Sequence, residues 1–409
     1  MEILEAVNWQ RPAGADSANV RDAVAAILAE IQERGDEAIL EYSQRFDGFA
    51  PEVIELTPFD ECDLAPDLRE SLEVAAARIE GFARLQMSMY TNIEGGDQFG
   101  RYGQKVLPIE RMAAYIPGGR FPLVSTALMT LIPARVAGVR DRVAVSPSRH
   151  PAVLAAASLA GATRFVHLGG AQAIAAAALG CAWMDAAHMV VGPGNAYVNE
   201  AKGLLQGHIK IDTLAGPSEI LVLCDETANP NWVALDVLAQ AEHDPMALSV
   251  LGSTSMDLLK RVADEVAQIA ARFPDKDQGI IQYVHCRDAQ DMVALSNVMG
   301  PEHLQVDCKE GFLDLDQLQH YGSLFVGAYS AVALGDYCTG PNHTLPTMGN
   351  ARHKGGLMVG DFLKIVTWQE IDGKRYDGLA KTAIRLAQEE DLMFHRMSLE
   401  ARLSSKATD

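Results

Sequence analysis

Short apolar runs alternate with alanine-rich amphipathic stretches through the middle of the chain. Between residues 106 and 220, apolar runs at 143–145, 165–168 and 189–191 are separated by stretches with helical spacing. This alternation is typical of βαβ units and a largely parallel sheet. A second series predicts strands at Ile220 to Cys224, Leu248 to Leu251, Ile280 to Val284 and Leu324 to Val326, with helices near Asn231 to Glu242 and Met256 to Phe273.

The two ends of the chain show helical periodicity instead. Apolar side chains recur at helical spacing over 16–46, with Gly35 dividing the stretch, and again over 66–89 and 379–403. We therefore expect an α/β fold with two Rossmann-like parallel-sheet domains and small N-terminal and C-terminal helical extensions. The expected segments are 1–14 at the N-terminus, 15–114 with 220–356 as the first domain, 115–219 as the second domain, and 357–409 as a C-terminal helical segment.

No turn from a predicted strand to a predicted helix carries the GxGxxG fingerprint of ordinary dinucleotide-binding domains. Glycines at 169–170 and 192–194 nevertheless stand where a strand ends and a helix begins. Their backbone N–H groups either face a phosphate at the positive end of the helix or serve a tight turn.

Composition narrows the class of protein and its partners. The 409 residues hold 34 Lys and Arg against 54 Asp and Glu, a net charge of −20, which disfavours nucleic acid and anionic membranes as partners. The six cysteines are scattered singly, so we expect neither a disulfide framework nor a thiolate zinc site. The start of the chain lacks the pattern of a signal peptide, and the most apolar stretch, 171–184, is too short to span a bilayer. These features predict a cytoplasmic protein acting on a small polar molecule.

One predicted helix begins at Pro230, with Asn229 as its N-cap. It carries Gln240 and His243, which are three residues apart and therefore on one helical face. An amide oxygen and an imidazole are acceptable ligands for zinc or a similar ion, although a histidine at a helix C-terminus is also stabilised by the helix dipole. The residues alone therefore allow both a metal ligand and a histidine that stabilises the helix end.

Three further groups of titratable residues are candidates for chemistry. Glu302 and His303 are adjacent in an expected short loop and can divide proton transfers between them, although such a pair also arises by chance. Glycines and prolines place Asp336 and His343 on an expected irregular loop. Glu390 and His395 share an expected C-terminal helix about 140° apart, where His395 fits either a cleft or a packed apolar stripe.

Together these segments resemble the histidinol dehydrogenase family from about Tyr115 to Arg402. The matching strings are long, uncommon and in one order. They include Tyr115-Ile116-Pro117-Gly118-Gly119, Gly169-Gly170-Ala171-Gln172, Gly192-Pro193-Gly194-Asn195, Ala215-Gly216-Pro217-Ser218-Glu219, Gln240-Ala241-Glu242-His243, Pro301-Glu302-His303-Leu304 and Gly340-Pro341-Asn342-His343-Thr344-Leu345-Pro346.

The resemblance implies roles for individual residues. One zinc ion per subunit would be held by Gln240, His243, Asp336 and His395. Substrate contacts would come from these four residues and from Ser218, His303, His343 and Glu390, while Tyr115, Gln172 and Asn195 would face NAD. The family forms homodimers whose C-terminal segment crosses to the neighbour, so residues 357–409 would serve dimerisation and His395 would complete the partner's site.

The implied reaction is oxidation of L-histidinol to L-histidine through the aldehyde, with two NAD. His303 would act as base and Glu302 would activate water. After Pro346 the sequence looks more like the related sulfopropanediol dehydrogenases. In this chain Arg352, His353 and Lys354, with Arg120 in the Tyr115 loop, either bind an anionic group or line a solvated rim. A dehydrogenase of another small polar alcohol is therefore the second hypothesis, and a non-catalytic zinc-binding scaffold is the third.

Overall fold

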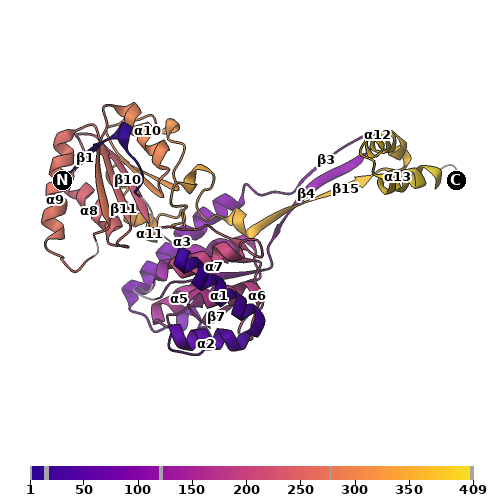
Figure 1. The fold of residues 1–409 in the computed structure, drawn as a ribbon, viewed down its shortest axis with the longest axis horizontal. Helices are drawn as coiled ribbons and strands as arrows, with labels where there is room; N and C mark the ends of the chain where they lie inside the picture. Colours follow the sequence, from indigo (N-terminus) through magenta and orange to yellow (C-terminus); the bar gives the residue numbers. More distant parts are fainter. Residues whose placement is uncertain (1, 13–17, 119–122, 277, 406–409) are drawn as a thin grey trace. The chain divides into compact units, whose positions relative to one another are not determined.

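The computed structural model describes residues 2–12, 18–118, 123–276 and 278–405. The chain forms two compact units: Met1–Met87 with Ile109–Phe362, and Ser88–Pro108 with Leu363–Asp409. The first unit contains two six-stranded sheets, and the second contains a three-stranded sheet (Figure 1). No helix in the described ranges is both long and apolar enough to cross a bilayer.

The first sheet of the larger unit, here called sheet 1, is parallel throughout, in the order β1-β12-β11-β10-β13-β14. All six residues of β10 are buried, because this central strand is covered on both faces. After β10, the strands β11 and β12 are added on one side and β13 and β14 on the other, so the strand order reverses between β10 and β13, as in a Rossmann half. Its strands are β1 (Ile3–Glu5), β10 (Glu219–Cys224), β11 (Leu248–Ser253), β12 (Ile280–His285), β13 (His303–Asp307) and β14 (Ser323–Val326), and its helices are α8 (Pro230–Ala241), α9 (Met256–Ala270), α10 (Ala289–Met299) and α11 (Val332–Tyr337).

The second sheet, sheet 2, has the order β2-β7-β6-β5-β8-β9, and all its pairings are parallel except that of β2 with β7. Its direction changes between β5 and β8. The strands are β2 (Glu52–Ile54), β5 (Arg111–Tyr115), β6 (Asp141–Ser146), β7 (Arg164–His167), β8 (Met189–Val191) and β9 (Lys210–Ile211). The helices of this part of the chain are α1 (Ala18–Arg34), α2 (Asp36–Phe46), α3 (Pro66–Met87), α4 (Val124–Ala137), α5 (Pro151–Ala160), α6 (Gly170–Leu179) and α7 (Ala196–Leu205).

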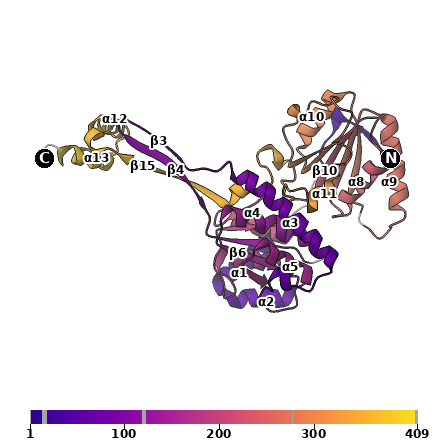
Figure 2. The ribbon, with the colours of Figure 1, turned by 180° about the vertical axis from the view of Figure 1, so that it is seen from behind.

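The observed packing differs from the expected grouping of segments. We expected residues 15–114 to join 220–356, but Val24, Ile31 and Ile39 of α1 and α2 share a core with strands of sheet 2. Figures 1 and 2 draw α1 and α2 together with the strands of that sheet. The N-terminal strand β1 joins sheet 1 instead, beside β12. Sequence periodicity identifies an apolar helix face but not the sheet that covers it, which explains the error.

The smaller unit contains strands as well as the expected helices. Three strands, β3 (Ile93–Asp97), β4 (Gly100–Pro108) and β15 (Leu363–Ile371), form its antiparallel sheet. Two helices, α12 (Tyr376–Glu389) and α13 (Met393–Ser405), follow β15 along the chain. The strands were missed because much of their surface is exposed, so no run of buried apolar residues marks them. The α/β class with two Rossmann-like parallel sheets is confirmed.

Candidate active site

Glu302 and His303 lie at the amino end of a buried strand rather than in the expected loop. His303 is the first residue of β13, where it pairs with Ile220 of β10 and Ser323 of β14. Glu302 and His303 are 6% and 5% exposed, respectively. Sheet pairing on both sides therefore fixes the backbone of an acid and an imidazole inside the protein.

The peptide groups of Glu219 hold both residues. The Glu219 N–H donates to Oε2 of Glu302 at 2.8 Å, and the Glu219 carbonyl lies 3.1 Å from Nδ1 of His303. Because a carbonyl can only accept, Nδ1 carries the proton and Nε2 of the neutral ring carries the lone pair. Nε2 faces Asp336, with 3.9 Å to its Oδ1.

Burial governs the electrostatics of this cluster. Desolvation, reinforced by His243 and His343, lowers the pKa of His303 to about 3. Desolvation and the nearby Asp336 carboxyl raise the pKa of Glu302 well above its usual value. Desolvation also raises the pKa of Asp336 to about 6. Burial therefore works against the charged form of each of these three groups.

His343 approaches the same place from the following loop. Its Nδ1 lies 3.0 Å from the carbonyl of Asp336, and its buried Nε2 has no hydrogen-bond partner among the described residues. A small cavity of about 10 Å³, room for roughly one water molecule, is lined by both His303 and His343. Asp336 itself belongs to the short helix α11, which corrects the expectation of an irregular loop, whereas His343 does lie outside helix and strand.

Gln240 and His243 lie at the C-terminal end of α8. The helix begins as predicted, with Asn229 capping it and Pro230 at the first position, but it ends at Ala241. His243 therefore lies beyond the helix and not on its face, although its N–H still reaches the Gln240 carbonyl at 3.3 Å.

The donor set at this end of α8 fits a metal ion. Gln240 is 4% exposed, and its buried amide nitrogen has no partner among the described residues; rotating the amide would present its oxygen there. His243 interacts electrostatically with Asp336 and His303, which places it beside the acid–imidazole pair. No three His, Cys, Asp or Glu side chains converge on one point within the described ranges, so the larger unit offers at most a partial coordination shell.

Glu390 and His395 belong to the smaller unit, and they are not on one helix. Glu390 is the C-cap of α12, the next residue Asp391 has a φ of 54°, and His395 lies on α13. The calculated 140° separation on a single helix is therefore wrong. His395 is exposed, and so are Leu392 (41%) and Phe394 (76%) beside it, so the alternative of a packed core histidine is also wrong.

The three residues predicted to face NAD lie at the carboxyl edge of sheet 2, where strands give way to helices. Tyr115 ends β5 and is 5% exposed, and burial raises its pKa to about 12. Gln172 is buried in α6 and donates to Asp47 at 3.0 Å. Asn195 is exposed and caps α7, with its Oδ1 accepting from the N–H groups of Tyr197 and Val198.

The glycine turn at 169–170 does not leave its donors free for a phosphate. The Gly169 N–H donates to Asp47 at 3.2 Å, and the Gly170 N–H donates to the hydroxyl of Tyr115 at 3.3 Å. Asp47 is thus an acid in this turn that no sequence motif singled out. Both contacts fit the interpretation in which these glycines serve a tight turn and do not bind a phosphate.

Glu219 is the main site residue that the sequence analysis missed. Its side chain is 2% exposed, forms an ion pair with Arg11 and accepts from the Met348 N–H at 3.2 Å. The preceding Ser218 is partly buried and receives the Leu248 N–H on its carbonyl. The sequence does place an acid directly before the apolar run 220–224, and this could have indicated a paired carboxylate, because buried acids require partners.

The described members of the proposed anion-binding set, Arg352, His353 and Lys354, differ in exposure. Arg352 is exposed and donates to the carbonyl of Val298, and Lys354 is partly buried. His353 is exposed, and Arg120 lies outside the described residues.

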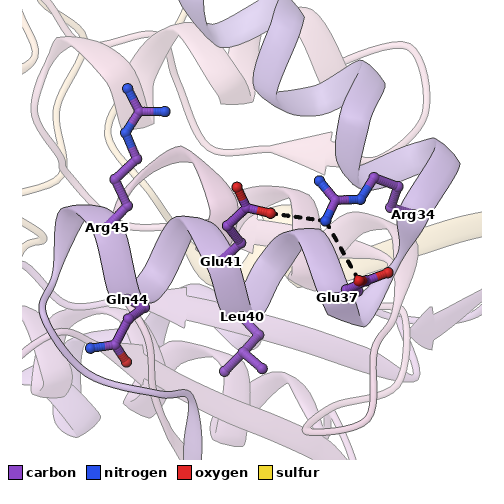
Figure 3. Close-up of a pocket in the computed structure, with 6 residues that line it drawn as sticks. All are labelled: Arg34, Glu37, Leu40, Glu41, Gln44 and Arg45. Carbon is purple, nitrogen blue, oxygen red and sulfur yellow. Dashed lines mark hydrogen bonds and ion pairs between the residues drawn. The ribbon is translucent and has the colours of Figure 1, made fainter.

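A shallow pocket on α1 and α2 contains none of the predicted site residues (Figure 3). Arg34 pairs there with Glu41 at 2.8 Å and with Glu37 at 3.8 Å. Because its charges engage one another at an open surface, this pocket is not a candidate active site.

Comparison with known proteins places the chain in one family. The sequence model of histidinol dehydrogenases matches residues 10–403. The histidinol dehydrogenase of Thermus thermophilus is 42% identical over 392 residues, covering 94% of each chain. That of Burkholderia lata is 40% identical over 415 residues, covering 95% of this chain and 93% of the relative. The crystal structure of histidinol dehydrogenase from Elizabethkingia anophelis has a TM-score of 0.87 at 31% identity, covering 97% of this chain and 95% of that one.

Fold, site and relatives together define an α/β oxidoreductase. The chain belongs to the histidinol dehydrogenase family. The family resemblance and the enzymatic class expected from the sequence are thereby confirmed, and a small-molecule substrate follows from the class.

Proposed function

We propose that this enzyme oxidises L-histidinol to L-histidine through histidinaldehyde, as a step of histidine biosynthesis. The observation that carries the proposal is the buried pair of Glu302 and His303, fixed by the peptide groups of Glu219 beside Asp336 and His343. Overall, the alcohol, one water and two NAD give the carboxylate, two NADH and three protons.

The two residues take successive proton transfers. Nε2 of His303 carries the lone pair because Nδ1 is bonded to the Glu219 carbonyl, so Nε2 accepts the alcohol proton as hydride leaves the carbinol carbon. In the second half-reaction Glu302, once ionised, accepts a proton from the water that attacks the aldehyde. Its Oε2 is held by the Glu219 N–H, which leaves Oε1 for this water.

Gln240, His243 and Asp336 would hold one zinc ion per subunit, with His395 of the partner subunit as the fourth ligand. A bound divalent ion there would orient the amine and imidazole of the substrate. The unpartnered amide of Gln240 supports this assignment. Ser218, His343 and Glu390 would contact the substrate around it.

NAD would bind at the carboxyl edge of sheet 2, beside Tyr115, Gln172 and Asn195, and would accept the hydride. The smaller unit would form a homodimer that shares its active sites, which is supported by the exposed apolar side chains of Phe394 and Met397 around His395. All six cysteines are free, which fits a reducing cytoplasm.

The test is NADH formation by the purified zinc-loaded enzyme from L-histidinol beside 2,3-dihydroxypropane-sulfonate, the substrate type of the related dehydrogenases. We expect turnover of L-histidinol at a kcat/KM at least about 100-fold higher, since a site matched to amine and imidazole loses these contacts with the sulfonate. Preference for the sulfonate would overturn the assignment of the substrate while leaving the dehydrogenase chemistry in place.

A further inference from the structure

A fully buried ion pair lies behind the glycine turn at 192–194. Lys202 of α7 and Asp212, which follows β9, have side chains that are 2% and 1% exposed and are paired with each other. Removing two charges from water is costly, and an apolar pair of similar volume usually serves stability as well or better. A contribution to stability alone therefore does not explain this pair.

Both members of the pair form hydrogen bonds with the backbone of a single residue, Gly192. Lys202 Nζ donates to the Gly192 carbonyl at 3.0 Å, and Asp212 Oδ2 accepts from the Gly192 N–H at 2.7 Å. The orientation of the peptide groups on either side of Gly192 is thus fixed by two charge-assisted hydrogen bonds.

Gly192 also lies tightly against the backbone of the neighbouring strand. Its φ is 113°, and a Cβ placed there would lie 2.1 Å from the carbonyl oxygen of Tyr115. Gly192 directly follows β8, and Tyr115 ends β5, so this contact lies at the point where sheet 2 changes direction. In doubly wound sheets a ligand binds in the crevice at the carboxyl ends of the strands at this point.

We propose that Lys202 and Asp212 are positioning residues for the dinucleotide: they set the Gly192 turn against Tyr115 so that the crevice between β5 and β8 is formed before NAD binds. The inference rests on the NAD site proposed above. It predicts that disrupting the pair weakens NAD binding even where the protein stays folded, because the turn then samples orientations that do not fit the cofactor.

The experiment measures the NAD dissociation constant directly by calorimetry on the zinc-loaded enzyme, together with the unfolding midpoint and zinc content. Two double variants remove the charges without leaving one unpaired. Lys202→Met with Asp212→Leu removes both side-chain hydrogen bonds to Gly192, and Lys202→Gln with Asp212→Asn keeps polar groups beside it. We expect NAD affinity to fall at least 10-fold in the first and by a smaller factor in the second, with zinc content unchanged in both.

A matched control replaces another ion pair of the same unit, Arg135→Met with Glu80→Leu, which joins α4 to α3. It should leave NAD affinity unchanged. A folded Met/Leu variant that binds NAD like the wild type would overturn the inference; if that variant does not fold, unchanged affinity in the Gln/Asn variant overturns it instead. Failure of the wild type itself to bind NAD would overturn the proposed function, and this inference with it.

Discussion

The carbonyl oxygen of Glu219 lies 3.1 Å from Nδ1 of His303, across the first residues of two neighbouring parallel strands. The same residue holds Glu302 through its N–H, and its carboxylate is buried against Arg11. One residue thus connects the N-terminal segment, the loop at Met348 and both proposed proton-transfer groups.

Replacing Glu219 by Gln should damage stability and catalysis together. The Arg11 charge would lose its buried partner, which costs roughly 3 kcal/mol of unfolding free energy. We also expect a lower kcat, because the Glu219 peptide groups that hold Glu302 and His303 are no longer positioned by the ion pair of the Glu219 side chain with Arg11. Urea unfolding and steady-state kinetics measure the two effects. Glu226→Gln is the matched control, since Glu226 pairs with Lys309 in the open at 3.4 Å and should change unfolding by less than about 1 kcal/mol. A Glu219→Gln enzyme as stable as wild type would refute the anchoring role.

Replacing His303 by Asn should reduce kcat at least about 100-fold, because the base for the alcohol proton is lost. Zinc content should remain that of the wild type, since His303 is not among the proposed ligands. Metal analysis and NADH formation are measured on the same preparation, beside His285→Asn as a histidine at the far end of β12 from the site. Loss of zinc from the His303 variant would contradict its assignment as a base.

Replacing Gly192 by Ala should lower the unfolding free energy by at least about 2 kcal/mol, because the residue has a φ of 113° and the new Cβ would meet the Tyr115 carbonyl. Thermal unfolding measures this. Gly207→Ala is the control, since a Cβ at Gly207 meets nothing within 4 Å. Equal stability of the two variants would show that β5 and β8 can separate freely at this point.

Sharing of the site between subunits can be tested by mixing inactive variants. If His395 completes the partner's site, unfolding and refolding Gln240→Ala with His395→Ala gives heterodimers with one intact site, and about one quarter of wild-type activity at random pairing. Mixing Gln240→Ala with His243→Ala is the control, because both changes fall in the same half of each site and no intact site results. A first mixture as inactive as the control would contradict a shared site.

Much of the fold followed from the sequence, because buried strands such as β10 and β11 are continuous apolar runs between helical stretches. The start of β13 did not, since a polar Glu302-His303 pair resembles a loop when only neighbouring residues are considered. The break at Asp391 was also invisible, because a positive φ at a non-glycine residue leaves no periodic signal. Spacing alone indicated Gln240 and His243 as candidate ligands, and joining them with Asp336 in one proposed ligand set required the resemblance to the family.

The stoichiometry of the reaction tests the central claim most directly. A limiting, measured quantity of L-histidinol is consumed to completion with excess NAD, and both NADH and L-histidine are quantified. The account predicts two NADH and one L-histidine for each L-histidinol, because Glu302 delivers water to the aldehyde formed with the help of His303. One NADH per alcohol with accumulation of the aldehyde, or no NADH at all, would contradict it.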